Sequence, residues 1–373
     1  MVAAGKLRNA LMLLPGIVFL LSLASMNSGR ILKGHNDFLQ LYCGARLAGT
    51  ADLYSVEANQ RVQREAIGLE MEGVYFSRPP FYALLLSPLG WLSYPHAYAV
   101  FQMVSLLSLA AFLRLYLPQL PELALYCSLS VPLLSSLANG QDIGLVLLLA
   151  GLSMPLMRRH YEFPAGLILA LCAIKFHLFL LVPLVLLIHR RWRVLAGSAT
   201  GGAALALASF VAGGPHWFQA YAVLLRNPAL HPASCNMPNL HGVLSAFSIS
   251  SSPTEAWLSL AVAGMVAYIA QKTPDVELAL AFALVGGLLI SLHAYVQDCV
   301  ILLLVFVVLC SKPVSRAEKA MAALAVLPPV YLLLLLGKPY SLAAPAMIFA
   351  LLFAGFVRSR NGAKPALSGA PRC

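Results

Sequence analysis

The sequence predicts an all-α protein that crosses a membrane many times. Of its 373 residues, 60% are hydrophobic and only 10% are charged, and the mean hydropathy is +0.81. A soluble domain is nearer to half apolar and a quarter charged, so most of this surface must face lipid. Apolar runs recur from one end of the chain to the other and leave no space for a soluble domain of ordinary size. We therefore expect a single integral membrane domain over residues 1–373.

Polar interruptions divide these runs into about 10–12 transmembrane helices, each of which needs roughly 17–25 residues if it is straight. Several runs are shorter, so we expect some helices to be broken, tilted or shielded by neighbours. The first run, residues 10–26, follows Lys6 and Arg8, as the apolar part of a signal peptide would. No small-residue cleavage site is obvious after it, so we interpret it as an uncleaved first helix.

The net charge of +11 does not indicate nucleic acid as a partner, because the basic residues collect on one side of this topology. The positive-inside rule makes that side cytoplasmic, with both termini on it, and places the polar face outside an inner cell membrane. The basic residues on the cytoplasmic side are Lys6, Arg8, Arg114, Arg158, Arg159, Arg190, Arg191, Arg193, Lys272, Lys312, Arg316, Lys319, Arg358, Arg360, Lys364 and Arg372.

Residues 28–80 are the most polar stretch and are expected to be a long first outer loop with interfacial helices. Helical spacing of apolar residues predicts a helix over 37–49, and the composition of 55–72 predicts an amphipathic helix on the membrane surface. The segment 81–92 is too short to span and is expected at the interface, where it would form a groove for a lipid tail. Residues 214–256 are expected to be a second outer loop and 358–373 a cytoplasmic tail.

The stretch 162–188 is apolar except at Lys175 and His177. As one helix, it would place the following arginine cluster outside the membrane. Two short helices that meet at an outer turn carrying Lys175 and His177 keep that cluster cytoplasmic. The other spans are predicted at 95–117, 120–138, 140–157, 194–213, 257–271, 276–292, 295–310, 320–336 and 340–357.

On this topology a set of polar residues without a simple structural role shares the outer face. A lysine in the apolar interior costs about 2.5–3.5 kcal/mol on insertion scales, so such groups usually line a cavity and have a partner. Their predicted convergence is therefore the main functional signal. The residues are Asp37, Arg78, Gln141, Asp142, Lys175, His177, His241, His293 and Asp298.

Each of these residues has a functional and a structural interpretation. Asp37 suits a general base for a hydroxyl, but an N-cap of a helix is the alternative, unless Asn36 provides the cap. Arg78 suits a bidentate phosphate contact, or else an arginine that reaches the interface. Lys175 and His177 suit neutralisation of a lipid phosphate, or else a lysine that extends to the outer surface.

The remaining polar residues give weaker signals. Gln141 and Asp142 follow Asn139-Gly140 at a polar corner, where they either cap a helix or line a pocket. His293 and Asp298 either form a structural pair or shape an acceptor pocket. Asn236, Asn239 and His241 lie in the second outer loop and favour neither interpretation.

Known metal and nucleotide signatures are missing from the sequence. It has no HExxH, Walker loop, CxxC pair or strand-borne GxGxxG, so soluble nucleotide and zinc chemistry have no support. The seven cysteines lack metal-type spacing. Cys43 and Cys235 are both expected outside, and whether they pair stays open.

These residues occur in an order that resembles glycosyltransferase family 87. The resemblance covers roughly residues 30–195 and is carried by the ordered set more than by any one motif. The set is Asp37-Phe38, Tyr42, Ala45, Gly49, Leu53-Tyr54, Arg78-Pro79-Pro80-Phe81, Leu84-Leu85-Leu86, Pro88-Leu89, Gly140-Gln141, Lys175, His177, Pro183-Leu184 and Arg190-Arg191-Trp192.

The resemblance implies a GT-C fold and an inverting sugar transfer, usually of mannose, from a polyprenyl-phosphate sugar. The acceptor would be a hydroxyl of an envelope glycan or glycolipid on the periplasmic or extracellular side. It also implies that Asp37 is the catalytic base. Arg78, Lys175 and His177 would bind the donor phosphate, with His293 as an alternative to His177. The residues assigned to the acceptor or sugar pocket are Gln141, Asp142, His241, His293 and Asp298.

The expected partners are the lipid-linked donor, the acceptor and membrane lipid, with no nucleic acid, cofactor or metal. The alternative function is a transporter or flippase for a lipid-linked or polar substrate, which would also carry intramembrane Lys, His and Asp. A structural subunit of an envelope-polysaccharide complex is a third alternative.

Overall fold

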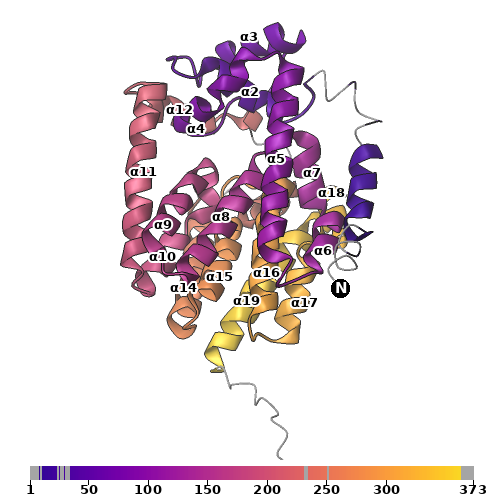
Figure 1. The fold of residues 1–373 in the computed structure, drawn as a ribbon, viewed down its shortest axis with the longest axis vertical. Helices are drawn as coiled ribbons and strands as arrows, with labels where there is room; N and C mark the ends of the chain where they lie inside the picture. The colour runs from indigo at the N-terminus through magenta and orange to yellow at the C-terminus, as the bar shows by residue number, and fades with distance from the viewer. Residues whose placement is uncertain are drawn as a thin grey trace, which may run out of the picture.

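The computed structural model describes residues 8, 11–22, 25, 29, 34–230, 234–249 and 252–362. Over these ranges every regular element is a helix, as Figure 1 shows, which confirms the predicted all-α class. Lys6, Lys364 and Arg372, which were predicted on the cytoplasmic side, lie outside the described residues.

Within the described residues, five helices are long and apolar enough to cross a membrane, which confirms a multi-pass architecture. A sixth crossing is added if α17 (Arg316–Leu324) and α18 (Pro328–Leu335), bent by 46°, count as one span. The expected 10–12 spans are approached only if shorter apolar helices also cross: Leu11–Ser22, α8 (Ile143–Arg158), α15 (Val276–Ile290) and Val296–Ser311. The five long helices are α5 (Tyr94–Tyr116), Glu162–Phe179, α11 (Trp192–Gly213), α14 (Ser252–Lys272) and Tyr340–Arg360.

The first predicted outer loop folds into a compact helical group at one end of the molecule (Figure 1). Its predicted helices are confirmed as α2 (Phe38–Leu47) and α3 (Val56–Ile67), followed by α4 (Pro80–Leu86) and η1 (Ser87–Trp91). α2 is buried on nearly all sides, since α3, α4 and η1 pack against it. The outer loop therefore forms a packed platform that carries Asp37 at the start of α2.

The chain descends through α5 and returns through α6 (Leu123–Leu129) and α7 (Val131–Asn139). The predicted span 120–138 is thus broken at Ser130, whose hydroxyl accepts a hydrogen bond from the Leu133 N–H and caps α7. Pro132 lies in the first turn of α7, a position where a proline does not disturb a helix. α8 descends again from the corner at Gly140.

α9 (Glu162–Leu171), η2 (Cys172–Phe179) and α10 (Val182–Ile188) form a hairpin with Lys175 near its tip. The backbone leaves helical geometry at Lys175, with φ −126° and ψ 55°. At the base, Arg191 Nη1 lies 2.7 Å from Glu162 Oε1, which joins the start of α9 to the end of α10. The predicted break at Lys175 is confirmed, although the helical run Glu162–Phe179 is itself long enough to count as a candidate span.

Ion pairs join the helix ends that lie opposite the outer-loop platform. Lys312 bonds Asp275 and Glu277, Arg158 also bonds Glu277, and Arg358 bonds Glu318. α8 has 16 residues, so its Arg158 end lies about 24 Å from its Asp142 end. The predicted basic side is therefore one end of the bundle.

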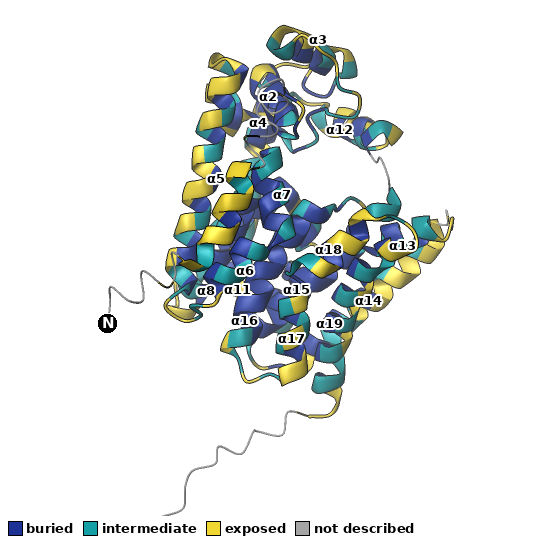
Figure 2. Cartoon of the chain, turned by 90° about the vertical axis from the view of Figure 1, so that its right-hand side faces the viewer, coloured by how far each residue is buried: buried dark blue, intermediate teal, exposed yellow. Residues whose placement is uncertain are grey.

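The second predicted outer loop is also helical, and α14 already begins at Ser252 within its expected range of 214–256. Similarly, α19 (Ala343–Arg360) extends into the expected tail 358–373. The buried helices α15 and α16 (Leu302–Ser311) run through the centre, and exposed residues follow α5 and α14 (Figure 2). The other elements are α12 (Trp217–Leu225), η3 (Pro228–Leu230), η4 (Ser234–Asn236), α13 (Leu240–Ala246), η5 (Val296–Ile301) and η6 (Tyr340–Leu342).

Candidate active site

Six of the predicted polar residues form one connected cluster beneath the outer-loop platform. They come from five parts of the chain: the start of α2, the segment before α4, the α7–α8 corner, the tip of the α9–α10 hairpin, and η5. The residues are Asp37, Arg78, Gln141, Asp142, Lys175 and Asp298. The predicted convergence of residues distant in the sequence is thus observed for these six.

Arg78 and Asp142 form a buried two-bond ion pair. Arg78 Nε donates to Asp142 Oδ2 at 2.9 Å, and Nη2 donates to Asp142 Oδ1 at 3.4 Å. The Tyr54 hydroxyl donates to the Arg78 carbonyl, and the prolines that follow start α4, so the backbone is held on both sides. Arg78 is only 6% exposed and therefore does not extend to the membrane surface.

Lys175 is the hub of the cluster. Its Nζ lies 2.7 Å from Asp298 Oδ1, and 3.4 Å from both Asp142 Oδ1 and Gln141 Oε1. The contacts with Asp298 and Gln141 are hydrogen bonds, and Asp142 adds an ion pair. At 3% exposure, Lys175 is buried among its partners and does not reach the outer interface.

Asp37 is turned toward this hub. Its Oδ2 accepts a 2.8 Å hydrogen bond from Gln141 Nε2, while Gln141 Oε1 faces Lys175 and Arg78. Asp37 makes no capping bond to α2, because Asn36 Oδ1 accepts from the Phe38 N–H instead. The N-cap alternative for the Asp37 side chain is therefore wrong, and its carboxylate is available for chemistry.

Burial raises the pKa of Asp37 above its ordinary value of 3.8. The hydrogen bond from Gln141 and the positive charges of Lys175 and Arg78 act in the opposite direction but do not cancel the effect of burial. A carboxylate with a raised pKa binds a proton more tightly and is a better general base near neutral pH.

Gly140 allows the α7–α8 corner to approach α2. Its φ of +65° is in the left-handed region, and a Cβ at this position would lie 2.7 Å from the Phe38 Cβ. Only glycine combines this backbone with this contact. The Gly140-Gln141 pair thus places the Gln141 amide beside Asp37.

The carboxylates of Asp142 and Asp298 both contact cations of the cluster. Asp142 precedes α8 but its side chain makes no capping bond. Asp298 Oδ2 accepts from the Tyr295 N–H at 2.9 Å, while its Oδ1 accepts from Lys175. Asp298 therefore both caps η5 and neutralises the hub. The His293 ring lies edge-on to Tyr295, with ring centroids 5.1 Å apart.

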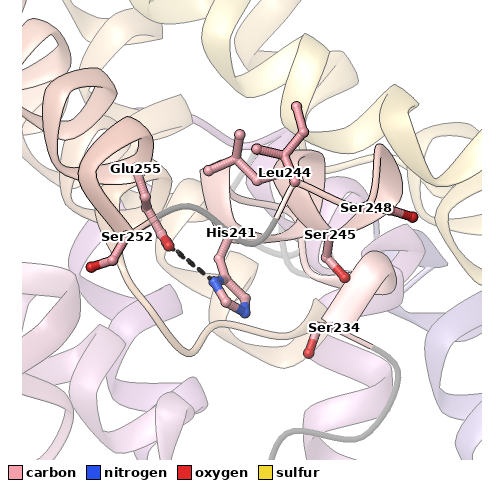
Figure 3. Close-up of a pocket in the computed structure, with 8 residues that line it drawn as sticks. Ser234, His241, Leu244, Ser245, Ser248, Ser252 and Glu255 are labelled. Atoms are coloured by element: carbon pink, nitrogen blue, oxygen red, sulfur yellow. Dashed lines mark hydrogen bonds and ion pairs between the residues drawn. The ribbon is translucent and has the colours of Figure 1, made fainter.

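His177 follows Lys175 by two residues, and its Nε2 is buried without a hydrogen-bond partner among the described residues. It is therefore the group of the predicted phosphate set with unused hydrogen-bonding capacity. His241 is placed elsewhere: its Nδ1 lies 3.2 Å from Glu255 Oε1, in a separate pocket between α13 and α14 (Figure 3).

A cavity of about 920 Å³ lies between the helix Leu11–Ser22, α7, η5 and α18. Along α7 its lining changes from Val131 and Leu134 to Asn139, which adjoins Gly140 and Gln141. No residue of the segment 81–92 lines it, so the predicted groove there is not this cavity. The polar lining residues include His35, Asn139, Asn236, Tyr295 and Gln297, and the apolar ones include Pro15, Phe19, Leu332 and Leu335.

Tyr295 is a site residue that the sequence did not single out. It lines this cavity, and the charges of Asp37 and Asp298 both act on its phenol. Sequence alone offers one indirect signal, its position two residues after His293 and three before Asp298.

The described part of the chain offers neither a metal site nor the disulfide considered from the sequence. It contains no group of three or more His, Cys, Asp or Glu that suits a metal ion. Cys43 and Cys235 are both free thiols, so the pairing left open by the sequence does not occur.

Comparison with known proteins adds one finding to this geometry. The family model for glycosyltransferase family 87 matches residues 76–295, more than half of the chain. The match includes every cluster residue except Asp37 and Asp298. Neither a curated protein nor a solved structure matches the sequence.

Proposed function

The chain belongs to glycosyltransferase family 87, and from this premise we propose which sugar transfer this membrane glycosyltransferase performs. The donor is a polyprenyl-phosphate sugar, with mannose as the sugar. The acceptor is a hydroxyl of an envelope glycan or glycolipid, and the transfer inverts the anomeric carbon. The carrying observation is the position of Asp37, a partly buried carboxylate bonded to Gln141 beside two buried cations.

Asp37 acts as the general base in this proposal. The acceptor hydroxyl gives its proton to the Asp37 carboxylate, and its oxygen attacks the anomeric carbon from the face opposite the phosphate. The bond between that carbon and the phosphate oxygen breaks, and the lipid phosphate leaves with the electron pair. A positioned base contributes about 10²–10⁴-fold to the rate of such a step.

The leaving phosphate needs positive charge that is already in place. Arg78 and Lys175 supply it from buried positions that require no rearrangement during the reaction. Preorganised charges of this kind stabilise a transition state more than water can. Lys175 bonds Asp298 and Gln141, so it acts on the phosphate through its charge and holds Gln141. His177 Nε2 has no partner among the described residues and can bond the phosphate.

The cavity at Tyr295 suits a molecule with an apolar tail and a polar head. Its volume of about 920 Å³ lies within the range of ligand sites, and its lining changes from apolar to polar toward Gln141. We assign the lipid portion of a substrate to the part lined by Phe19, Leu332 and Leu335. The polar head would then lie near Tyr295 and Asp37.

The site faces the periplasm or exterior in this proposal. It lies at the end of the bundle opposite the ion-paired basic residues, and basic ends are retained in the cytoplasm. The two termini are assigned to that basic side, and no cofactor beyond the lipid-linked donor is proposed.

A transfer assay tests the proposal. Purified full-length protein is incubated with labelled polyprenyl-phosphate mannose, glucose and other sugars together with an envelope lipid extract. We expect labelled product from mannose, and its loss in Asp37→Asn at unchanged expression. No product from any donor contradicts the proposed donor class. Uptake or flipping of the donor without transfer supports the alternative, a transporter or flippase.

A further inference from the structure

A second cavity lies between η4, α13 and the start of α14, and the reaction described above does not use it. Its volume is about 600 Å³, and Figure 3 shows its lining side chains. It is distinct from the ion-pair cluster, with which it shares none of its lining residues.

Six of the eight residues that line this cavity carry a hydroxyl, imidazole or carboxylate group, and Leu244 and Ile249 add apolar surface. His241 Nδ1 lies 3.2 and 3.3 Å from the two carboxylate oxygens of Glu255, so the ring is held in one orientation. Its second nitrogen faces away from Glu255 (Figure 3). Four hydroxyls complete the polar lining: Ser234, Ser245, Ser248 and Ser252.

This chemistry favours a neutral ligand rich in hydroxyl groups. The Glu255 carboxylate repels a phosphate or carboxylate, and the described residues offer no three-ligand metal group here. A bare alkyl chain offers no hydrogen-bond partner to the hydroxyl, imidazole and carboxylate groups of the lining. By contrast, a sugar hydroxyl both donates and accepts, so it can bond a serine, an imidazole and a carboxylate at once.

The cavity is connected to the reaction centre through Asn239. Its Oδ1 caps α13 at Gly242, and its Nδ2 donates to the Ser291 carbonyl at 2.6 Å. Ser291 begins the segment that leads to Tyr295. In addition, η4 separates the two cavities, because Ser234 lines this one and Asn236 lines the cavity at Tyr295.

We propose that this pocket is a subsite for non-reacting sugar units of a glycan acceptor, with His241 and Glu255 as its central contacts. This inference rests on the proposed function, since it assigns the place of the acceptor. A glycan bound here lies next to η4, and a further unit can pass it toward Tyr295 and Asp37. Glu255 accepts sugar hydroxyls, and His241 bonds another through its free nitrogen.

Photolabelling tests whether the pocket binds sugar. The probes are octyl α-mannoside and octyl β-glucoside that carry a diazirine, with the matching alkyl phosphate as comparison. They are applied to the full chain in a detergent without a sugar headgroup. We expect the glycosides to label residues 234–255. The loss of a hydrogen bond to a charged group in Glu255→Gln should lower this labelling about tenfold. His241→Gln should act in the same direction.

Glu122→Gln is the matched control, because Glu122 is an exposed carboxylate at the start of α6. It should leave labelling and transfer unchanged. In the transfer assay, Glu255→Gln should raise the KM for the acceptor and keep the KM for the donor, which also shows that the variant is folded. Labelling confined to residues outside 234–255, labelling of 234–255 that is insensitive to both pocket variants, or preference for the phosphate probe would overturn the subsite. Absence of transfer by the wild type would instead overturn the proposed function.

Discussion

Gln141 Nε2 donates a 2.8 Å hydrogen bond to Asp37 Oδ2, while the other end of the same amide faces Lys175 and Arg78. The proposed base and the cations are therefore joined through a single side chain. Because the amide oxygen of Gln141 faces the two cations, its amide nitrogen points at the Asp37 carboxylate. This link makes the protonation of Asp37 sensitive to Gln141.

Transfer should depend on pH through Asp37. The reaction needs the carboxylate, so the rate should fall as the pH falls through the raised pKa of Asp37, at a midpoint above 3.8. The bond from Gln141 lowers that pKa, and Gln141→Leu should therefore move the midpoint upward by about one pH unit. The measurement is kcat against pH with saturating donor. An identical midpoint in the variant would show that Gln141 does not affect the pKa of Asp37.

Asp142→Asn should destabilise the protein strongly. It leaves Arg78 and Lys175 buried with one carboxylate fewer, and the removal of one partner from a buried ion pair costs about 3–5 kcal/mol. Arg46→Ala is the control, because the Arg46–Glu65 pair is 39% and 52% exposed and contributes about 0–1 kcal/mol. Thermal unfolding of both variants in detergent checks the difference. Equal shifts in Tm would show that the cluster is accessible to water.

Gly140→Ala should reduce transfer with little loss of donor binding. The added methyl would meet Phe38 at 2.7 Å and push the α7–α8 corner, with Gln141, away from Asp37. A displacement of about 1 Å at a catalytic group lowers kcat about 100-fold.

Gly68→Ala separates this contact from backbone strain. Gly68 also has a positive φ, +74°, but nothing lies within 4 Å of an added Cβ. The Gly68→Ala variant should be somewhat less stable than the wild type and keep the same kcat. Equal loss of kcat in both variants would assign the effect to backbone strain alone.

The orientation of the bundle can be measured with introduced cysteines. In a chain that lacks Cys235, Cys310 and Cys373, Glu72→Cys should react with a membrane-impermeant maleimide added to intact cells. Arg316→Cys should react only after the cells are opened, because it starts α17 at the basic end. Both positions are exposed, so burial does not explain a difference. The reverse pattern would invert the proposed orientation.

The sequence predicted which polar residues converge better than it predicted how they are bonded. Charge asymmetry required a break near Lys175, and the break occurs at that residue. However, hydropathy does not show that Asp142 contacts both cations, since that depends on the packing of three helices. The number of membrane spans could not be predicted from hydropathy either, because a helix buried by its neighbours can be as apolar as one that faces lipid.

His241 shows a second limit of the sequence. It was grouped with Gln141 and Asp298 because all three were expected on the outer side. The partner of His241 is Glu255, 14 residues later in the chain. This local contact directs the His241 side chain into a different pocket. Sidedness places residues in one layer, but it does not distinguish two cavities within that layer.

The order in which the cluster partners leave the ribosome has a consequence for biogenesis. Arg78, Asp142 and Lys175 are synthesised well before Asp298, which supplies the closest contact of the lysine at 2.7 Å. A nascent chain that ends before η5 carries Arg78 and Lys175 together with the carboxylates of Asp37 and Asp142, so its cluster charges balance in number. Its Lys175 nevertheless lacks the closest contact, so the tip of the α9–α10 hairpin gains its strongest anchor only once η5 is in place.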